Sequence, residues 1–120
     1  MASISKNGII TMNAGDYFKY PLFINAGSVM EPLRYILEND DKVLFSIMEP
    51  NQPFEHGILR KIYTKENLNV WGDVEVEFDS TDTENLLPGT YYYEVKLLIN
   101  KDNKTCVSTV VPKKKFYVME

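Results

Sequence analysis

Two side chains stand out as candidates for nucleophilic or transition-metal chemistry, namely His56 and Cys106, the single histidine and the single cysteine among 120 residues. Pairs of nucleophile and base, and transition-metal sites, generally draw on several such residues. His56 lies in a proline-containing loop, which predicts a solvent-exposed imidazole. Cys106 lies beside Val107 on a predicted strand, where we expect a small buried or half-buried hydrophobe. The sequence therefore predicts a protein that is not an enzyme.

Carboxylates are plentiful, and paired carboxylates can do acid–base work or bind calcium. They gather at residues 38–41 and 79–84. Neither group has the alternating ligand positions and the terminal bidentate glutamate of a calcium loop, so turn and helix-capping roles are favoured. The glycines are scattered singly among turns, which excludes a phosphate-binding loop. We expect no metal and no cofactor.

The charge balance bears on possible partners and on location. The formal net charge is −4 and the pI is about 5.0, whereas nucleic-acid binding usually needs a basic stripe. The lysines at 113–115 follow Pro112 and are expected to keep an edge strand soluble. The sequence contains neither an apolar run of membrane-spanning length nor the apolar core of a signal peptide. We therefore expect synthesis in the cytoplasm and no nucleic-acid or membrane partner.

The elements that hold these side chains follow a period of two. Residues 74–78 read Val-Glu-Val-Glu-Phe, and residues 91–99 alternate with their odd positions apolar or aromatic. We expect Val74, Val76 and Phe78 to share the inner face of the first segment, and the odd positions of the second segment to face the core. Segments rich in aromatic or β-branched residues predict about eight strands, at 9–12, 17–24, 42–48, 58–64, 74–78, 91–99, 105–111 and 115–118.

Compact turn signals separate these segments, and no amphipathic stretch long enough for a helical crossover lies between them. Two short helix candidates lie at 32–37 and 81–86, the second of which is expected to be a turn between strands. The loop at 49–56 is predicted to be exposed and irregular, and the insertion from Gln52 to Gly57 has no assigned role. The pattern predicts one antiparallel all-β domain over residues 1–120, a sandwich or a small barrel with one or two short helical turns.

The segment 81–93 combines a helical turn, a Pro-Gly turn and a strand that opens on three tyrosines. We expect Leu86 or Leu87 to plug the end of the core and an inward tyrosine hydroxyl to bond nearby backbone. This pattern is similar to the tyrosine corner of immunoglobulin-like sandwiches. An inward residue 92 would also turn Glu94 inward, so Tyr91 and Tyr93 are the expected inward positions.

With these residues in view, the chain resembles the immunoglobulin-like β-sandwich domain of bacteriophage tail, baseplate and head-fibre proteins, in particular the N-terminal domain of upper baseplate proteins. The resemblance covers about residues 8 to 118. The features that carry it are Gly15-Asp16-Tyr17-Phe18, the strands at 43–47 and 58–63, the run at 82–86 before residues 89–95, and the closing Phe116-Tyr117-Val118. Upper baseplate proteins continue into a coiled coil, whereas this chain stops two residues after the closing strand. The resemblance therefore implies an all-β fold, an antiparallel immunoglobulin-like β-sandwich of about seven to eight strands with one or two short helical turns. It also implies a small free-standing virion protein or an adaptor domain.

The expected function is that of a non-enzymatic virion structural or adaptor protein, which docks onto other virion proteins or copies of itself in the tail, baseplate or capsid. The candidate partner contacts are outward aromatic residues. A carbohydrate-binding module on the same fold is the alternative, with Trp71 and nearby tyrosines stacked on sugar rings. The candidate contacts are Tyr17, Tyr20, Trp71, Tyr92 and Tyr117.

Overall fold

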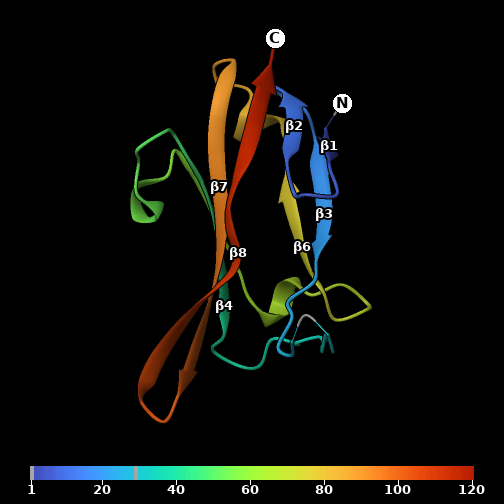
Figure 1. Ribbon diagram of the computed structural model, residues 1–120, viewed down its shortest axis with the longest axis vertical. Helices are drawn as coiled ribbons and strands as arrows, with labels where there is room; N and C mark the ends of the chain where they lie inside the picture. The colour runs from blue at the N-terminus through green and yellow to red at the C-terminus, as the bar shows by residue number, and fades with distance from the viewer. Residues whose placement is uncertain (1, 29) are drawn as a thin grey trace.

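The computed structural model describes residues 2–28 and 30–120 and consists mostly of β-strands in two facing layers (Figure 1). The larger layer is a six-stranded sheet in the order β1 (Ser3–Ile4), β2 (Ile10–Asn13), β8 (Lys104–Met119), β7 (Gly89–Lys101), β4 (Lys42–Met48) and β5 (Leu59–Tyr63). The smaller layer pairs β3 (Phe18–Leu22) with β6 (Val74–Phe78). The short helical segments are η1 (Phe54–His56), η2 (Lys65–Asn67) and α1 (Ser80–Thr83). The expected β-rich fold is confirmed.

One strand pair departs from the expected antiparallel pattern. Strand β2 runs parallel to β8, with Ile10 opposite Phe116 and Asn13 opposite Met119. The expectation excluded parallel neighbours because they need a long crossover connection. That requirement excludes parallel pairing only for strands that are close in sequence. All of the domain between β2 and β8 connects these two strands, so they can pair in parallel without a dedicated crossover helix.

The core lies between the two layers and is built from the inner faces of the strands. The odd positions of β7 are buried from Tyr91 to Leu97, and Val74, Val76 and Phe78 are buried on β6, as the period of two predicted. Phe78 is the centre of this core, because the centre of its ring lies 5.8 Å from the centre of the Phe18 ring and 5.2 Å from that of Phe45. The aromatic rings therefore connect the two layers.

Tyr91 and Tyr93 face inward and bond nearby backbone as expected. The Tyr91 hydroxyl donates a hydrogen bond to the Leu87 carbonyl oxygen at 2.7 Å, and the Tyr93 hydroxyl donates to the Gly8 carbonyl oxygen. Leu86 packs against the core, while Leu87 is 75% exposed. Two inward hydroxyls thus tie the start of β7 to backbone on both sides of it.

The acidic group at 79–84 has the capping role that the sequence predicted. Asp79 is the N-cap of α1, and its side chain accepts a hydrogen bond from the Asp82 backbone N–H at 3.0 Å. The Asp82 side chain accepts in return from the Asp79 N–H. The second helix candidate is therefore a single helical turn between β6 and β7. The first, at 32–37, is not a helix because its backbone pairs with the preceding segment, as in the 2.8 Å bond from Tyr35 N–H to the Ile24 carbonyl oxygen.

The insertion from Gln52 to Gly57 covers the outer face of the larger sheet, which corrects the expectation of a wholly exposed loop. Its Phe54 is only 7% exposed, and the Phe54 carbonyl oxygen accepts a hydrogen bond from the buried Ser46 hydroxyl of β4 at 2.8 Å. The Lys96 ammonium lies 4.5 Å from the centre of the Phe54 ring. His56 is exposed, as expected.

The hairpin of β7 and β8 extends beyond the two layers as an arm (Figure 1). Asp102 and Asn103 have φ values of 52° and 61°, as in the tight two-residue turns that suit hairpins. Residues 101–109 are all exposed. Cys106 lies on this arm, so the expectation of a buried or half-buried cysteine is wrong. The local sequence pattern could not show that β7 and β8 extend beyond the core.

Candidate functional site

The edge of β8 that faces away from β7 is paired over only a small part of its length. Strand β2 occupies that edge at residues 116–119. From Lys104 to Lys115 no other strand in residues 2–28 and 30–120 pairs with it, and we call this stretch the free edge. Pro112 lies within it, where the pairing of β8 with β7 shifts register, and prolines inside strands are confined to such irregularities and to edge strands. The free edge therefore leaves backbone donors and acceptors available for another strand.

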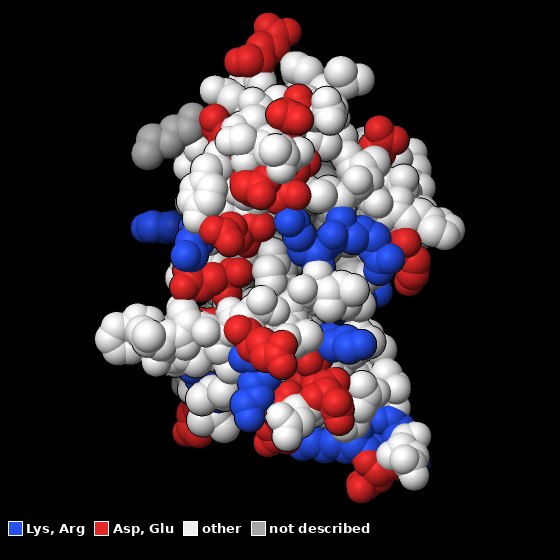
Figure 2. Space-filling view, turned by 180° about the vertical axis from the view of Figure 1, so that it is seen from behind, with Lys and Arg blue, Asp and Glu red and all other residues white. Residues whose placement is uncertain are grey.

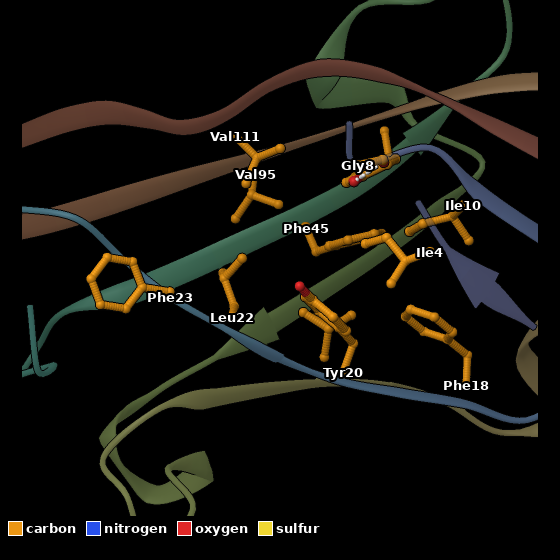
Figure 3. Close-up of a pocket in the computed structure, with 12 residues that line it drawn as sticks. Ile4, Gly8, Ile10, Phe18, Tyr20, Leu22, Phe23, Phe45, Val95 and Val111 are labelled. Atoms are coloured by element: carbon orange, nitrogen blue, oxygen red, sulfur yellow. Dashed lines mark hydrogen bonds between the residues drawn. The ribbon is translucent and has the colours of Figure 1, made fainter. Parts of the chain in front are cut away.

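An apolar cavity of about 210 Å³ opens between the layers beside the free edge (Figure 3). Val111 of β8 and Val95 of β7 line it on one side, and Phe18, Tyr20 and Leu22 of β3 line it on the other. Ile4 and Ile10 close the end nearest β2, while Phe23 stands at the opposite end, as the close-up shows. The cavity exists because the two strands of the smaller sheet cover only part of the six-stranded sheet.

A second cavity of about 420 Å³ continues from the first toward the arm. Phe23 lines both cavities, and the β8 residues that line them, Ser108 to Val111, are consecutive. Leu97 and Ile99 of β7 lie beneath the second cavity, and residues 23–26 and Tyr35 form its other wall. We call the two cavities together the groove. The groove follows the free edge from Val111 to Ser108, and the described residues that line it include no charged side chain.

Strand parity determines which β8 side chains face the groove. Ser108 is opposite Leu97, which belongs to the core, and directly opposite residues in an antiparallel pair share a face. Ser108 therefore lies on the groove side of β8. Val107, opposite Leu98, lies on the other face, where it is 57% exposed. These neighbouring positions make a matched pair for substitution.

Lysines lie near both ends of the free edge, with Lys104 near the arm tip and the run at 113–115 between Val111 and the stretch that pairs with β2. Lys113 lies on the outer face of the sheet, with its ammonium 5.7 Å from the centre of the Tyr92 ring. None of these four lysines forms an ion pair with a carboxylate in the described part of the chain. By contrast, Lys61 pairs with Asp82 at 2.8 Å and Lys101 with Glu38 at 3.5 Å. On the face shown in Figure 2, acidic and basic side chains are interspersed. The free edge is thus flanked by positive charge that no described acid neutralises.

Two tyrosines connect the groove to the core. Tyr20 shares the inner face of β3 with Phe18 and Leu22, yet it is 38% exposed because the groove is open beside it. Tyr93 is almost fully buried at the groove wall. Burial raises the pKa of the Tyr93 hydroxyl to about 12, and the nearby Tyr20 phenol adds to this effect. Burial also raises the pKa of Tyr63.

These pKa shifts predict a loss of stability in alkali. An unfolded tyrosine ionises near pH 10, so between about pH 10 and about pH 12 the unfolded chain releases protons that the folded chain retains. The free energy of unfolding should be constant with respect to these groups below pH 10 and should fall as pH rises through that window. Urea titrations followed by circular dichroism from pH 8 to pH 11.5 would measure it.

Tyr93→Phe is the control for this prediction. It should lower the free energy of unfolding at pH 8 by about 1 kcal/mol, because the Gly8 carbonyl loses its donor. Above pH 10 the variant should lose stability less steeply than the parent chain. An equally steep loss in both proteins would show that Tyr93 does not carry the predicted pKa shift.

Comparisons of this chain with protein-family models, with curated proteins and with solved structures found no match. The geometry of the groove alone therefore identifies it as the candidate functional site. Among residues 2–28 and 30–120, no group of three or more histidine, cysteine, aspartate or glutamate side chains is arranged to hold a metal ion. None of the helical segments described has the length and apolar character needed to cross a membrane.

The structure places the five aromatic residues predicted as partner contacts on different surfaces. Tyr17 immediately precedes β3 and is 54% exposed, and its hydroxyl donates to Glu77 at 2.5 Å, which raises the pKa of Tyr17. Tyr92 and Tyr117 lie diagonally across β7 and β8 on the outer face of the larger sheet, each partly buried. Tyr20 alone of the five lines the groove. The five do not form one surface.

Trp71 is the most exposed of the five, at 72%, in the loop before β6. The Arg34 guanidinium donates to the Trp71 carbonyl oxygen at 3.2 Å and pairs with Asp73 at 3.1 Å. The same guanidinium lies over the Phe23 ring, 5.7 Å from its centre. Arg34 therefore links the Trp71 loop to the groove through Phe23.

Sequence reasoning missed the apolar residues of the groove, because each one reads as an ordinary core position on its strand. Their common feature is that the opposite layer does not cover them, which depends on the pairing of distant strands. One signal was present in the sequence. The lysines after Pro112 were expected to mark an edge strand, and they flank the free edge.

Proposed function

We propose that this chain is a non-enzymatic structural or adaptor protein of a bacteriophage virion, made in the host cytoplasm and incorporated into the tail, baseplate or capsid. Within the virion it docks onto neighbouring structural proteins. The sequence resemblance described above suggests the setting. Two facing β-layers and the bond from the Tyr91 hydroxyl to the Leu87 carbonyl support an immunoglobulin-like sandwich within that setting.

The observation that carries the assembly role is the free edge above an apolar groove. A monomeric protein normally shields such an edge, because unpaired backbone beside apolar surface favours pairing with other chains. Here twelve residues of β8, from Lys104 to Lys115, are open on one side, and the arm places part of them outside the two layers. An assembly protein needs a rigid contact surface of this kind, and strand addition would supply it.

The coding neighbourhood of the gene tests the virion setting directly. The proposal expects flanking genes for portal, tail or baseplate proteins. Flanking genes for polysaccharide degradation would contradict the virion role and would favour the alternative function. Immunogold labelling of purified virions is the corresponding measurement on the particle, with label expected at a fixed position on the tail or head.

A carbohydrate-binding module is the second candidate, and the exposure of Trp71 is the observation that favours it. An exposed indole face can stack on a sugar ring, and Asp73 and Asn69 lie beside it as polar groups. A glycan array with the parent chain and Trp71→Ala separates the two functions. The assembly role predicts no sugar-specific signal for either protein. A specific signal that Trp71→Ala abolishes and Ile62→Ala retains would establish the binding module.

A further inference from the structure

Every open strand edge in a two-layer domain is a possible docking site. The outer edge of β5 is such an edge and is compared with the free edge. Strand β5, at the far end of the larger sheet, has only five residues. Its Lys61 is paired with Asp82, and its Tyr63 hydroxyl accepts a hydrogen bond from the Glu77 N–H at 3.1 Å. The free edge is longer, its lysines lack carboxylate partners among the described residues, and an apolar groove lies beneath it.

Added strands place alternate side chains on opposite faces. A strand paired with β8 from Thr105 to Val111 would be about seven residues long and roughly 23 Å in length at about 3.3 Å per residue. Every second side chain of that strand would point into the groove, toward Leu97, Val95 and Phe23. The first cavity is lined mainly by apolar and aromatic side chains, and the second adds the polar groups of Asn25, Ser108 and Thr109 to Leu97 and Ile99. Apolar side chains at those alternate positions therefore fit the groove, which offers them no charged partner among the described residues.

Charge decides between a second copy of this chain and a different partner. Two copies joined edge to edge along β8 would bring eight lysines to one interface, four from each copy, with no carboxylate from β8 itself to offset them. An incoming strand that carries carboxylates would instead meet Lys104 at one end and the lysines at 113–115 at the other. The free edge therefore complements an acidic strand and opposes a copy of itself.

We propose that the free edge of β8 and the groove beneath it bind an extended acidic segment of another protein, with apolar side chains at alternate positions and carboxylates between and beside them. The incoming segment adds a seventh strand to the larger sheet next to β8, below β2. Its apolar side chains fill the two cavities, and its carboxylates pair with the lysines at the two ends of the free edge. This inference rests on the proposed assembly function and names the chemistry of the partner.

The test uses a fluorescein-labelled peptide, Asp-Ile-Glu-Val-Glu-Leu-Asp, titrated with the full chain and followed by fluorescence anisotropy. We expect saturable binding that weakens as the salt concentration rises from about 0.05 M to about 0.5 M. A peptide of the same composition with its apolar residues grouped together, and a peptide with lysine in place of every acidic residue, should each bind at least about tenfold more weakly.

Two matched pairs of variants locate the binding surface. Ser108→Gln places a long polar side chain on the groove face, where it displaces the apolar side chains of the peptide, and should weaken peptide binding by at least about fivefold. Val107→Gln, one residue away on the opposite face, adds no charge beside the peptide carboxylates and should change binding by less than about twofold. Substituting glutamate for all three lysines at 113–115 should weaken binding by a similar factor and flatten its salt dependence. Lys65→Glu, far from the groove in η2, should do neither. Circular dichroism melts confirm that each variant is folded.

Three outcomes would overturn the proposal. They are absence of saturable binding, equal effects of Ser108→Gln and Val107→Gln, and a dimer of the parent chain in sedimentation that Ser108→Gln dissociates. The last outcome would assign the free edge to a second copy. None of these outcomes bears on the coding neighbourhood, so failure of the acidic-strand proposal is distinguishable from failure of the virion role.

Discussion

Replacing Phe78 by alanine is expected to lower the free energy of unfolding by about 3 to 5 kcal/mol. Phe78 has no exposed surface, and its ring contacts rings from both layers: Phe18 on β3, Phe45 on β4 and Phe116 on β8. Truncation removes the transfer free energy of the ring and leaves a cavity where the layers meet. Since whole domains are stable by only about 5 to 15 kcal/mol, this variant should lie close to the limit of folding.

Urea denaturation followed by tryptophan fluorescence and far-ultraviolet circular dichroism would measure this loss, with an expected fall in Tm of roughly 10 to 25 °C. Ile62→Ala is the control, because Ile62 is 62% exposed on β5 and its truncation should cost no more than about 1 kcal/mol. Similar losses in the two variants would contradict the placement of Phe78 at the centre of the core.

Replacing Gly57 by alanine is expected to cost about 2 to 3 kcal/mol, because the insertion is pressed against the outer face of β4. A β-carbon on Gly57 would lie 2.0 Å from the Ser46 hydroxyl oxygen and 2.7 Å from the Ile47 carbonyl oxygen. Neither atom can move freely, because Ser46 is fully buried and hydrogen bonded to Phe54, and the Ile47 carbonyl oxygen accepts a hydrogen bond from the Ile58 N–H. The insertion must therefore lift away or the strand must shift.

The same denaturation experiment tests this prediction, and proteolysis would show whether the insertion becomes accessible. Glu55→Ala is the matched control, since Glu55 is exposed in the same insertion and its loss should stay within about 0.5 kcal/mol. If Gly57→Ala proved as stable as Glu55→Ala, the close contact between the insertion and β4 would be refuted.

The strands of this protein could be predicted from sequence where local alternation decides the structure. The bounds of β4 and β6 match the predicted segments at 42–48 and 74–78, and the inward parity of β7 follows from its apolar odd positions. Capping by the acidic group at 79–84 was also predictable, because carboxylates that precede a short helical turn satisfy its free N–H groups.

The local sequence pattern could not predict the pairing between distant segments. The parallel contact of β2 with β8 and the continuity of β8 through Pro112 depend on which edges remain free after the sheet has formed. The burial of Phe54 was missed for the same reason, because the residues that contact it, Ser46 and Lys96, lie on β4 and β7. The groove arises from the unequal size of the two sheets, which no single segment of the sequence records.

The aromatic residues illustrate the same limit at the candidate site. Exposure of Trp71 follows from its turn, but the position of Tyr20 inside the groove depends on the missing cover between β3 and β8. An inward strand position normally implies burial. Here it implies a side chain at the wall of an open cavity.

The central claim, that the free edge of β8 receives another strand, is tested most directly by residue-resolved amide hydrogen exchange. The measurement compares the full chain alone with the chain saturated by the acidic peptide. The account predicts that alternate amides between Thr105 and Val111 exchange at least about tenfold more slowly in the complex, while the amides of β5 are unchanged. Protection that appears on β5 or on the β3–β6 sheet, with none on β8, would contradict it.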